Sequence, residues 1–171
     1  MNQTTTPAVS PFIAIIFRLL NYIEIIALIG TALGLALLYA SLPGAQEMLM
    51  IFLSVLSAVF FLKGYEPRPV PEQKDGEPKL GFIDLLALQI VPKVAWIGCA
   101  VATTGILFRI LNLKGNGELM MIGCAVLTAA LLLVGIFIVS KPERSVGLMP
   151  LVYRAAPLCL VGYYLLMSEP G

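Results

Sequence analysis

Apolar residues gather along the chain into five long runs that are separated by short polar segments. The runs are Phe12 to Tyr39, Met48 to Leu62, Val94 to Leu111, Leu119 to Val139 and Leu148 to Met167. Unsatisfied backbone groups are prohibitively costly in lipid, and a helix of about 20 residues crosses a bilayer. The pattern therefore predicts an all-α integral membrane protein with about five transmembrane helices. The last run is the least regular, because Pro150, Arg154 and Pro157 interrupt it.

The first and third runs exceed the length of one span. Arg18 and Asn21 divide the first run, and Pro92 with Lys93 separates the third from an apolar approach over Leu80 to Val91. One interpretation is a short interfacial helix, an elbow and then the span. The alternative is one long tilted helix. The proline and the charges favour the elbow.

Composition agrees with a membrane location. Of the 171 residues, 59% are hydrophobic and only 12% are charged, and the mean hydropathy is +0.94. A soluble domain carries about twice that share of charge, and one small core could not hide so much apolar surface. The net charge of +1 leaves no basic tail for nucleic acid. The expected partners are the lipid bilayer and either further copies of the chain or other membrane protein subunits.

The sequence offers few residues for catalysis or metal binding. It contains no histidine, which excludes His-ligated haem, His-based metal sites and His general bases. The three cysteines, Cys99, Cys124 and Cys159, lie far apart and form no CxxC pair. No phosphate loop, nucleophile–base arrangement or pair of catalytic carboxylates is present. We therefore expect no enzymatic activity, no catalytic residue, no metal and no cofactor.

Basic residues are unevenly distributed between the two sides that five spans define. Arg109 and Lys114 fall on one side, and nine fall on the other: Arg18, Lys63, Arg68, Lys74, Lys79, Lys93, Lys141, Arg144 and Arg154. The positive-inside rule places the N-terminus and the polar segment Gly64 to Lys79 in the cytoplasm, and the C-terminus outside. Labelling of that segment by a membrane-impermeant reagent in intact cells would overturn this topology.

The chain matches itself when it is shifted by 71 residues. Segment Leu42 to Leu62 then lies over Leu113 to Leu133, with nine identities in 21 positions. Each copy is one helical hairpin, and a repeat of two spans gives both copies the same orientation in the membrane. The predicted organisation is an N-terminal segment with the first hairpin (1–67), a polar cytoplasmic linker (68–81), a second hairpin (82–140) and a C-terminal helix (141–171).

Each hairpin turn combines a glycine with a glutamate three residues later. The pairs are Gly44 with Glu47 and Gly115 with Glu118. Glycine permits a tight reversal of the chain. A carboxylate in the first turn of the next helix faces unpaired N–H groups and the positive end of the helix dipole. The functional alternative is a ring of acids that gathers cations at the outer face.

Small residues form rows in the first helix of each hairpin. Gly30 and Gly34 lie in the first copy, and Gly98, Ala102 and Gly105 lie in the second. Such rows let helices approach closely in lipid. We expect them to pack the two hairpins together or against a partner chain.

Ionisable residues within spans are candidates for a functional role. Glu24, Lys93, Arg109 and Arg154 each lie within about two turns of a predicted interface, where long side chains can reach water. Glu24 and Lys93 occupy nearly equivalent depths in the duplicated helices. The predicted charge contact is therefore an intramembrane Glu24–Lys93 ion pair.

The first hairpin carries a motif that extends beyond its turn. The matching residues are Leu42-Pro43-Gly44-Ala45, Glu47-Met48-Leu49-Met50-Ile51, and Phe60-Phe61 through Tyr65-Glu66-Pro67; the second copy keeps Gly115, Glu118 and Met121-Ile122. This pattern resembles GldL, the inner-membrane motor protein of the Bacteroidota type 9 secretion system. The resemblance implies a GldL-related, multi-pass protein of the bacterial inner (cytoplasmic) membrane.

The resemblance does not extend to the motor glutamate of GldL, which is tied to proton-driven rotation. The corresponding positions are Leu56 or Ser57 in the first copy and Leu127 or Thr128 in the second. None of these side chains carries a proton that it can release at neutral pH, so motor activity is not expected.

Two function hypotheses follow from these patterns. The leading one is a non-enzymatic scaffold or accessory subunit of a membrane complex. The alternative is a small oligomeric transporter or channel, supported by the duplication and by polar residues in the spans: Thr31, Ser54, Ser57, Thr103, Thr104 and Thr128. A dry apolar centre would favour the scaffold, and a polar cavity at mid-membrane would favour transport.

Overall fold

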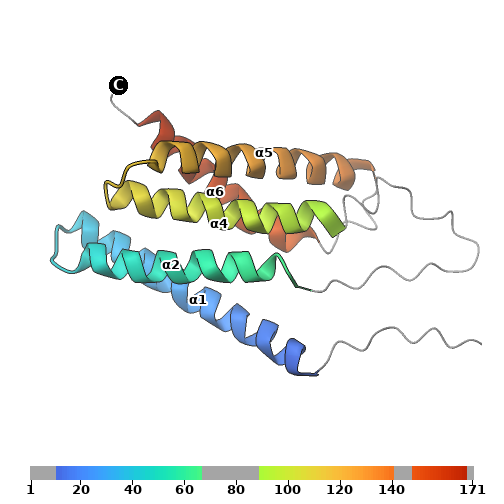
Figure 1. The fold of residues 1–171 in the computed structure, drawn as a ribbon, viewed down its shortest axis with the longest axis horizontal. Coiled ribbons are helices and arrows are strands. Elements are labelled where there is room, and N and C mark those ends of the chain that lie inside the picture. Colours follow the sequence, from blue (N-terminus) through green and yellow to red (C-terminus); the bar gives the residue numbers. More distant parts are fainter. Residues whose placement is uncertain (1–10, 67–88, 141–147, 169–171) are drawn as a thin grey trace, which may run out of the picture.

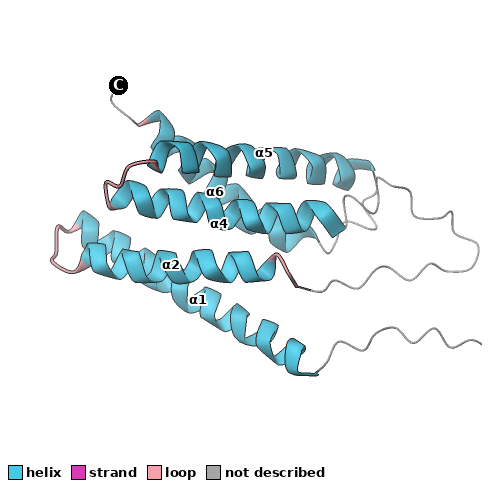
Figure 2. Ribbon diagram, in the orientation of Figure 1, coloured by secondary structure: helices cyan, strands magenta, loops and turns pink. Residues whose placement is uncertain are grey.

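The computed structural model describes residues 11–66, 89–140 and 148–168. These residues form five helices and no strand (Figure 2). The helices are α1 (Pro11–Tyr39), α2 (Ala45–Lys63), α4 (Val91–Ile110), α5 (Asn116–Ser140) and α6 (Met149–Met167). All five are long and apolar enough to cross a membrane. The predicted all-α, multi-pass membrane fold is confirmed.

The five helices run back and forth along one bundle (Figure 1). Both hairpin turns, α1–α2 and α4–α5, lie at the same end, so the two hairpins have the same orientation, as the repeat predicts. The chain enters α1, α4 and α6 at the opposite end. Which end faces the cytoplasm stays a prediction from the basic residues. The predicted linker, 68–81, lies outside the described residues.

The first apolar run forms one continuous helix, α1, of 29 residues. The elbow predicted near Arg18 and Asn21 is wrong, and the alternative of one long helix is right; its tilt in the membrane stays a prediction. Sharp kinks arise at proline, at small-residue pairs or at bulges, and polar side chains alone do not cause them. In α4, Pro92 lies in the first turn, where its missing N–H needs no partner. Residues 80–88 of the approach lie outside the described part of the chain.

The two turns have the same backbone geometry at equivalent positions. Ser41 and Asn112, 71 residues apart, have φ angles of 54° and 52°, and Gly44 and Gly115 have φ angles of 87° and 85°. The N–H of Leu42 donates to the carbonyl of Leu37 at 3.0 Å, and the equivalent bond from Leu113 to Phe108 measures 2.9 Å. This bond and the left-handed residue before it form the Schellman motif that ends many helices. The sequence repeat is therefore also a structural repeat.

The small-residue rows pack within each hairpin. A Cβ atom added to Gly34 would lie 2.9 Å from the Leu49 side chain of α2, and one added to Gly105 would lie 2.7 Å from Met120 Cγ of α5. Gly30 lies against the Phe52 ring in the same manner. The prediction that these rows pack the hairpins together is wrong. A tight turn brings consecutive antiparallel helices side by side, so the closest approach occurs there.

The small-residue row in α4 also lies against Gly123 and Val126 of α5. A Cβ atom added to Gly123 would lie 2.7 Å from the backbone nitrogen and Cα of Ala102, and one added to Gly98 would lie 3.0 Å from the Val126 side chain. Backbone therefore touches backbone at the centre of the second hairpin. Such close approach increases dispersion contacts, which are a main source of helix association in lipid.

The two hairpins join through α2 and α4. The rings of Phe60 and Trp96 lie 5.7 Å apart. One turn deeper, the Ser57 hydroxyl donates to the carbonyl of Ala100 at 3.0 Å and lies 2.9 Å from the Thr104 hydroxyl. The last helix, α6, packs against α4 and α5, with Gly162 against the sulfur of Cys124.

Candidate functional site: a buried ionic cluster

The carboxylate of Glu24 lies inside the bundle. Leu20, Glu24 and Ala27 follow one another at helical spacing on the face of α1 that packs inward, and all three are buried. The Glu24 side chain is only 1% exposed. A lone charge at such a position is costly, so the carboxylate requires compensating partners.

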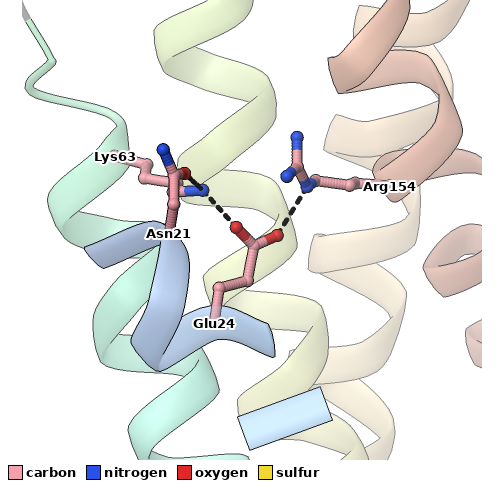
Figure 3. Close-up of polar contacts among 4 residues, drawn as sticks. All are labelled: Asn21, Glu24, Lys63 and Arg154. Atoms are coloured by element: carbon pink, nitrogen blue, oxygen red, sulfur yellow. Dashed lines mark hydrogen bonds and ion pairs between the residues drawn. The ribbon is translucent and has the colours of Figure 1, made fainter. Parts of the chain in front are cut away.

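Two cations from two other helices provide that compensation (Figure 3). Lys63, the last residue of α2, forms an ion pair with Glu24 Oε2 and donates a hydrogen bond to Asn21 Oδ1 at 2.7 Å. From α6, Arg154 Nε lies 2.5 Å from Glu24 Oε1, as an ion pair without hydrogen-bond geometry. The Lys63 side chain is 4% exposed and that of Arg154 is 36% exposed. Glu24 therefore connects α1 to both α2 and α6.

A fourth helix contributes Trp96. Lys63 Nζ lies 5.3 Å and Arg154 Cζ lies 5.8 Å from the centroid of its ring. Cations within about 6 Å of an aromatic ring are attracted by its quadrupole. The indole N–H of Trp96 is buried and has no hydrogen-bond partner among the described residues. We refer to Asn21, Glu24, Lys63, Trp96 and Arg154 together as the ionic cluster.

The predicted Glu24–Lys93 pair is wrong. Lys93 is exposed, and Glu24 pairs instead with Lys63 and Arg154. With the shift of 71 residues, the structural equivalent of Glu24 is Ala95, which is buried. Lys93 comes two residues earlier, which is about 200° around an α-helix, so its side chain leaves from the opposite face. Glu24 and Lys93 lie at similar depths but do not meet, because their side chains leave their helices in different directions.

The second hairpin places apolar residues where the first has its ion pair. Ala95 and Val134 are the equivalents of Glu24 and Lys63, and each is 1% exposed. The same backbone hairpin thus forms without the charges. The ion pair is therefore an addition to the hairpin and not a requirement of its packing.

Sequence analysis places Lys63 only among the cytoplasmic bases and misses its role. A usable signal exists in the periodicity of α2, where Leu49, Leu53, Leu56 and Phe60 form the buried stripe. Lys63 continues that stripe at helical spacing. A lysine on a buried stripe needs an acid close by, and Glu24 is the acid on the corresponding face of α1.

The predicted turn acids lie at the other end of the bundle. Glu47 and Glu118 are exposed and occupy the first turns of α2 and α5, as predicted. They lie next to Gly44 and Gly115, in the turns of the two hairpins. Their place fits the helix-dipole interpretation.

The four positions compared above with the motor glutamate of GldL hold uncharged groups that contact neighbouring helices. Leu56 and Leu127 are buried. Ser57 bonds to α4 as described above, and the Thr128 hydroxyl donates to the carbonyl of Cys124 and lies 3.1 Å from the Tyr163 hydroxyl of α6. Equivalent hydroxyls thus contact the next helix along the chain in both copies.

A groove of about 570 Å³ opens sideways between α2 and α4. Its polar lining consists of Ser54, Ser57 and Thr104, and the remainder is apolar, including Phe61 and Phe108. The groove lies nearer the middle of the helices than the ionic cluster does, and it opens at the surface of the bundle. Its three hydroxyl residues are what the transporter alternative can draw on, although most of the lining is apolar.

Comparison with known proteins gives no match: no family model, no curated protein and no solved structure matches this chain. The resemblance to GldL therefore rests on the turn and hairpin residues alone.

Proposed function

We propose that this protein is a non-enzymatic scaffold or accessory subunit of a membrane complex. The observation that supports this proposal most is the apolar interior of the bundle. Among the described residues, only Glu24, Lys63 and Thr103 are buried polar or charged side chains. Glu24 and Lys63 pair with each other, and Thr103 bonds to the carbonyl of Cys99 at 2.8 Å. Ion paths are lined by carbonyl or charged groups apart from short hydrophobic gates, and the described interior of one copy has no such lining.

The outer surface of the bundle is suited to contacts within the membrane. Ile25, Ile26, Ile29 and Leu33 of α1 are all more than half exposed. α1 packs mainly on α2, so most of its apolar surface faces lipid or a neighbouring subunit. Apolar surface of this kind provides an interface for helices of other subunits or further copies of the chain.

The relation to GldL is part of this proposal. It is supported by the Pro43-Gly44 turn, by Glu47 and by their counterparts in the second copy. It places the protein in the bacterial inner membrane, with the N-terminus in the cytoplasm as the basic residues predict. Because the motor glutamate is replaced by apolar or hydroxyl residues, the proposed role is structural and not motive.

The alternative, a small oligomeric transporter or channel, is favoured by the lateral groove. Ser54, Ser57 and Thr104 would line a shared path if the grooves of several copies faced one another. In this arrangement the path exists only in the oligomer, so the apolar interior of one copy does not oppose it. Flux measurements separate this alternative from the scaffold.

Purification of the native protein in mild detergent tests the scaffold proposal. We expect a particle of fixed stoichiometry and well above the 18.4 kDa of one chain, containing further copies or other membrane subunits. Glu24→Gln is expected to weaken this assembly because α1 loses its ionic contacts to α2 and α6. Glu47→Gln, an exposed acid in a turn, is the matched control and is expected to leave the particle intact. A chain that purifies only as a monomer would contradict the proposal.

A further inference from the structure

The ionic cluster carries unequal charges. One carboxylate, Glu24, faces two cations, Lys63 and Arg154. Described charges around the same end are the exposed bases Arg18 and Lys93 and the half-buried acid Glu66. The net charge of these six residues is therefore positive. An excess positive charge beside a membrane is a site for anions.

The guanidinium of Arg154 keeps most of its donors free. Only Nε contacts Glu24, and the two terminal nitrogens are not joined to the carboxylate (Figure 3). They form no hydrogen bond or ion pair with any residue that the structure describes. These nitrogens carry four N–H groups in a planar fork, which matches the oxygens of a phosphate. With 36% of its side chain exposed, Arg154 is open to a ligand from outside the bundle.

The depth of the cluster fits the headgroup region of a bilayer. Arg154 is five residues after Met149, the start of α6, which is about 8 Å along the helix axis. Lys63 is the last residue of α2. Trp96, which is buried, lies against both cations. The long side chains of the cluster are thus within reach of the ends of the helices, where lipid phosphates are expected.

We propose that the ionic cluster binds a phosphate group, supplied by the headgroup of an anionic lipid, through the terminal nitrogens of Arg154. Lys63 contributes charge but uses its own donors on Glu24 and Asn21. Glu24 pairs with Nε, which leaves the terminal nitrogens for a ligand. A basic pocket between transmembrane helices is a known type of site for lipid headgroups. The site does not depend on whether the protein is a scaffold.

Trp96 makes this binding measurable because it is the only tryptophan in the chain. Purified protein in a neutral detergent is titrated with dihexanoyl phosphatidylglycerol, dihexanoyl phosphatidylcholine or sodium phosphate, and Trp96 emission is recorded. We expect a saturable change with phosphatidylglycerol at concentrations about tenfold below those for phosphatidylcholine, as a charge-assisted contact provides. Equal response to sodium phosphate alone would support the phosphate site but assign it to a free anion.

Three variants distinguish a site from a generally basic surface. Arg154→Gln is expected to weaken phosphatidylglycerol binding about tenfold or more, since its fork supplies the charge-assisted bonds. Arg154→Gln retains the neutral Glu24–Lys63 pair. If Arg154→Gln fails to fold, Arg154→Lys tests the same contact, because it keeps the charge but loses the planar fork. Arg18→Gln removes an exposed base at the same end and is expected to have little effect.

Glu24→Gln provides the result that a purely structural role would not give. It removes the only carboxylate of the ionic cluster, so phosphatidylglycerol binding is expected to become tighter while the fold becomes less stable. Equal losses in Arg154→Gln and Arg18→Gln, or no saturable response to either phosphatidylglycerol or sodium phosphate, would overturn the proposal.

Discussion

Replacement of Glu24 by alanine is expected to destabilise the protein by about 3–5 kcal/mol, the range for breaking a buried ion pair from one side. The reason is that Lys63, 4% exposed, then remains buried without its carboxylate. Arg154 loses the same partner but is partly exposed, so it can turn toward the interface. The free energy of unfolding in mixed detergent micelles measures the effect. Glu47→Ala is the control, with an expected loss below about 1 kcal/mol for an exposed helix-terminal acid.

The second hairpin supplies the design of a compensating variant. Ala95 and Val134 occupy the positions of Glu24 and Lys63 in the repeat, and both are buried. The double variant Glu24→Ala with Lys63→Val therefore gives the first hairpin the residue pair of the second. It is expected to recover most of the stability lost in Glu24→Ala, because replacing a buried ion pair by apolar residues is often neutral or stabilising. Losses that simply add in the double variant would show that the two charges act independently.

Replacement of Gly123 by alanine is expected to destabilise the protein by about 1–3 kcal/mol through overpacking. The added Cβ would lie 2.7 Å from backbone atoms of Ala102, which cannot move aside as the end of a side chain can. α4 and α5 would therefore have to separate along the second hairpin. Thermal unfolding in detergent, followed by circular dichroism, measures the loss.

Gly135→Ala is the matched control on the same helix. A Cβ atom added to Gly135 has no neighbour within 4 Å. Its expected effect is a gain of up to about 1 kcal/mol, since alanine has the higher helix propensity. Equal losses of stability in Gly123→Ala and Gly135→Ala would show that the close contact with Ala102 is not the reason for glycine at position 123.

The spans, the turns and the repeat could be predicted from the sequence because each depends on local chemistry. The observed helices begin and end within three residues of the predicted runs. Gly44 and Gly115 adopt the positive φ angles that favour glycine, and the repeat places them at equivalent points. The left-handed conformation of Asn112 fits a residue type that ends helices in this way, whereas Ser41 has no such preference, so the Schellman ending of α1 is harder to predict.

The partners of Glu24 could not be predicted from depth alone. Depth correctly places Glu24 near the end of the bundle where Lys63, Lys93 and Arg154 also occur, but the direction of each side chain selects between them. Lys63 lies on the inward stripe of α2, whereas Lys93 leaves the exposed face of α4. The contact with Arg154 further requires the packing of α6, which no local pattern in the sequence specifies.

The small-residue rows show the same limit. The spacing of the small residues correctly predicts a close contact between helices, but it does not predict which helix is contacted. Gly34 and Gly105 lie against Leu49 and Met120, which are the second helices of their own hairpins. The hairpins instead meet through bulkier and polar side chains, such as Phe60 with Trp96 and Ser57 with Thr104.

We propose that this protein supports a membrane assembly and does not itself move protons. The most direct test is acidification of proteoliposomes under an imposed potassium diffusion potential, with a pH-sensitive dye inside. We expect vesicles with the wild type or with Glu24→Gln to acidify no faster than protein-free vesicles, because Glu24 is the only buried acid described and is paired with Lys63 and Arg154. Robust proton uptake by the wild type that disappears in Glu24→Gln would contradict the scaffold and place Glu24 in a transport mechanism.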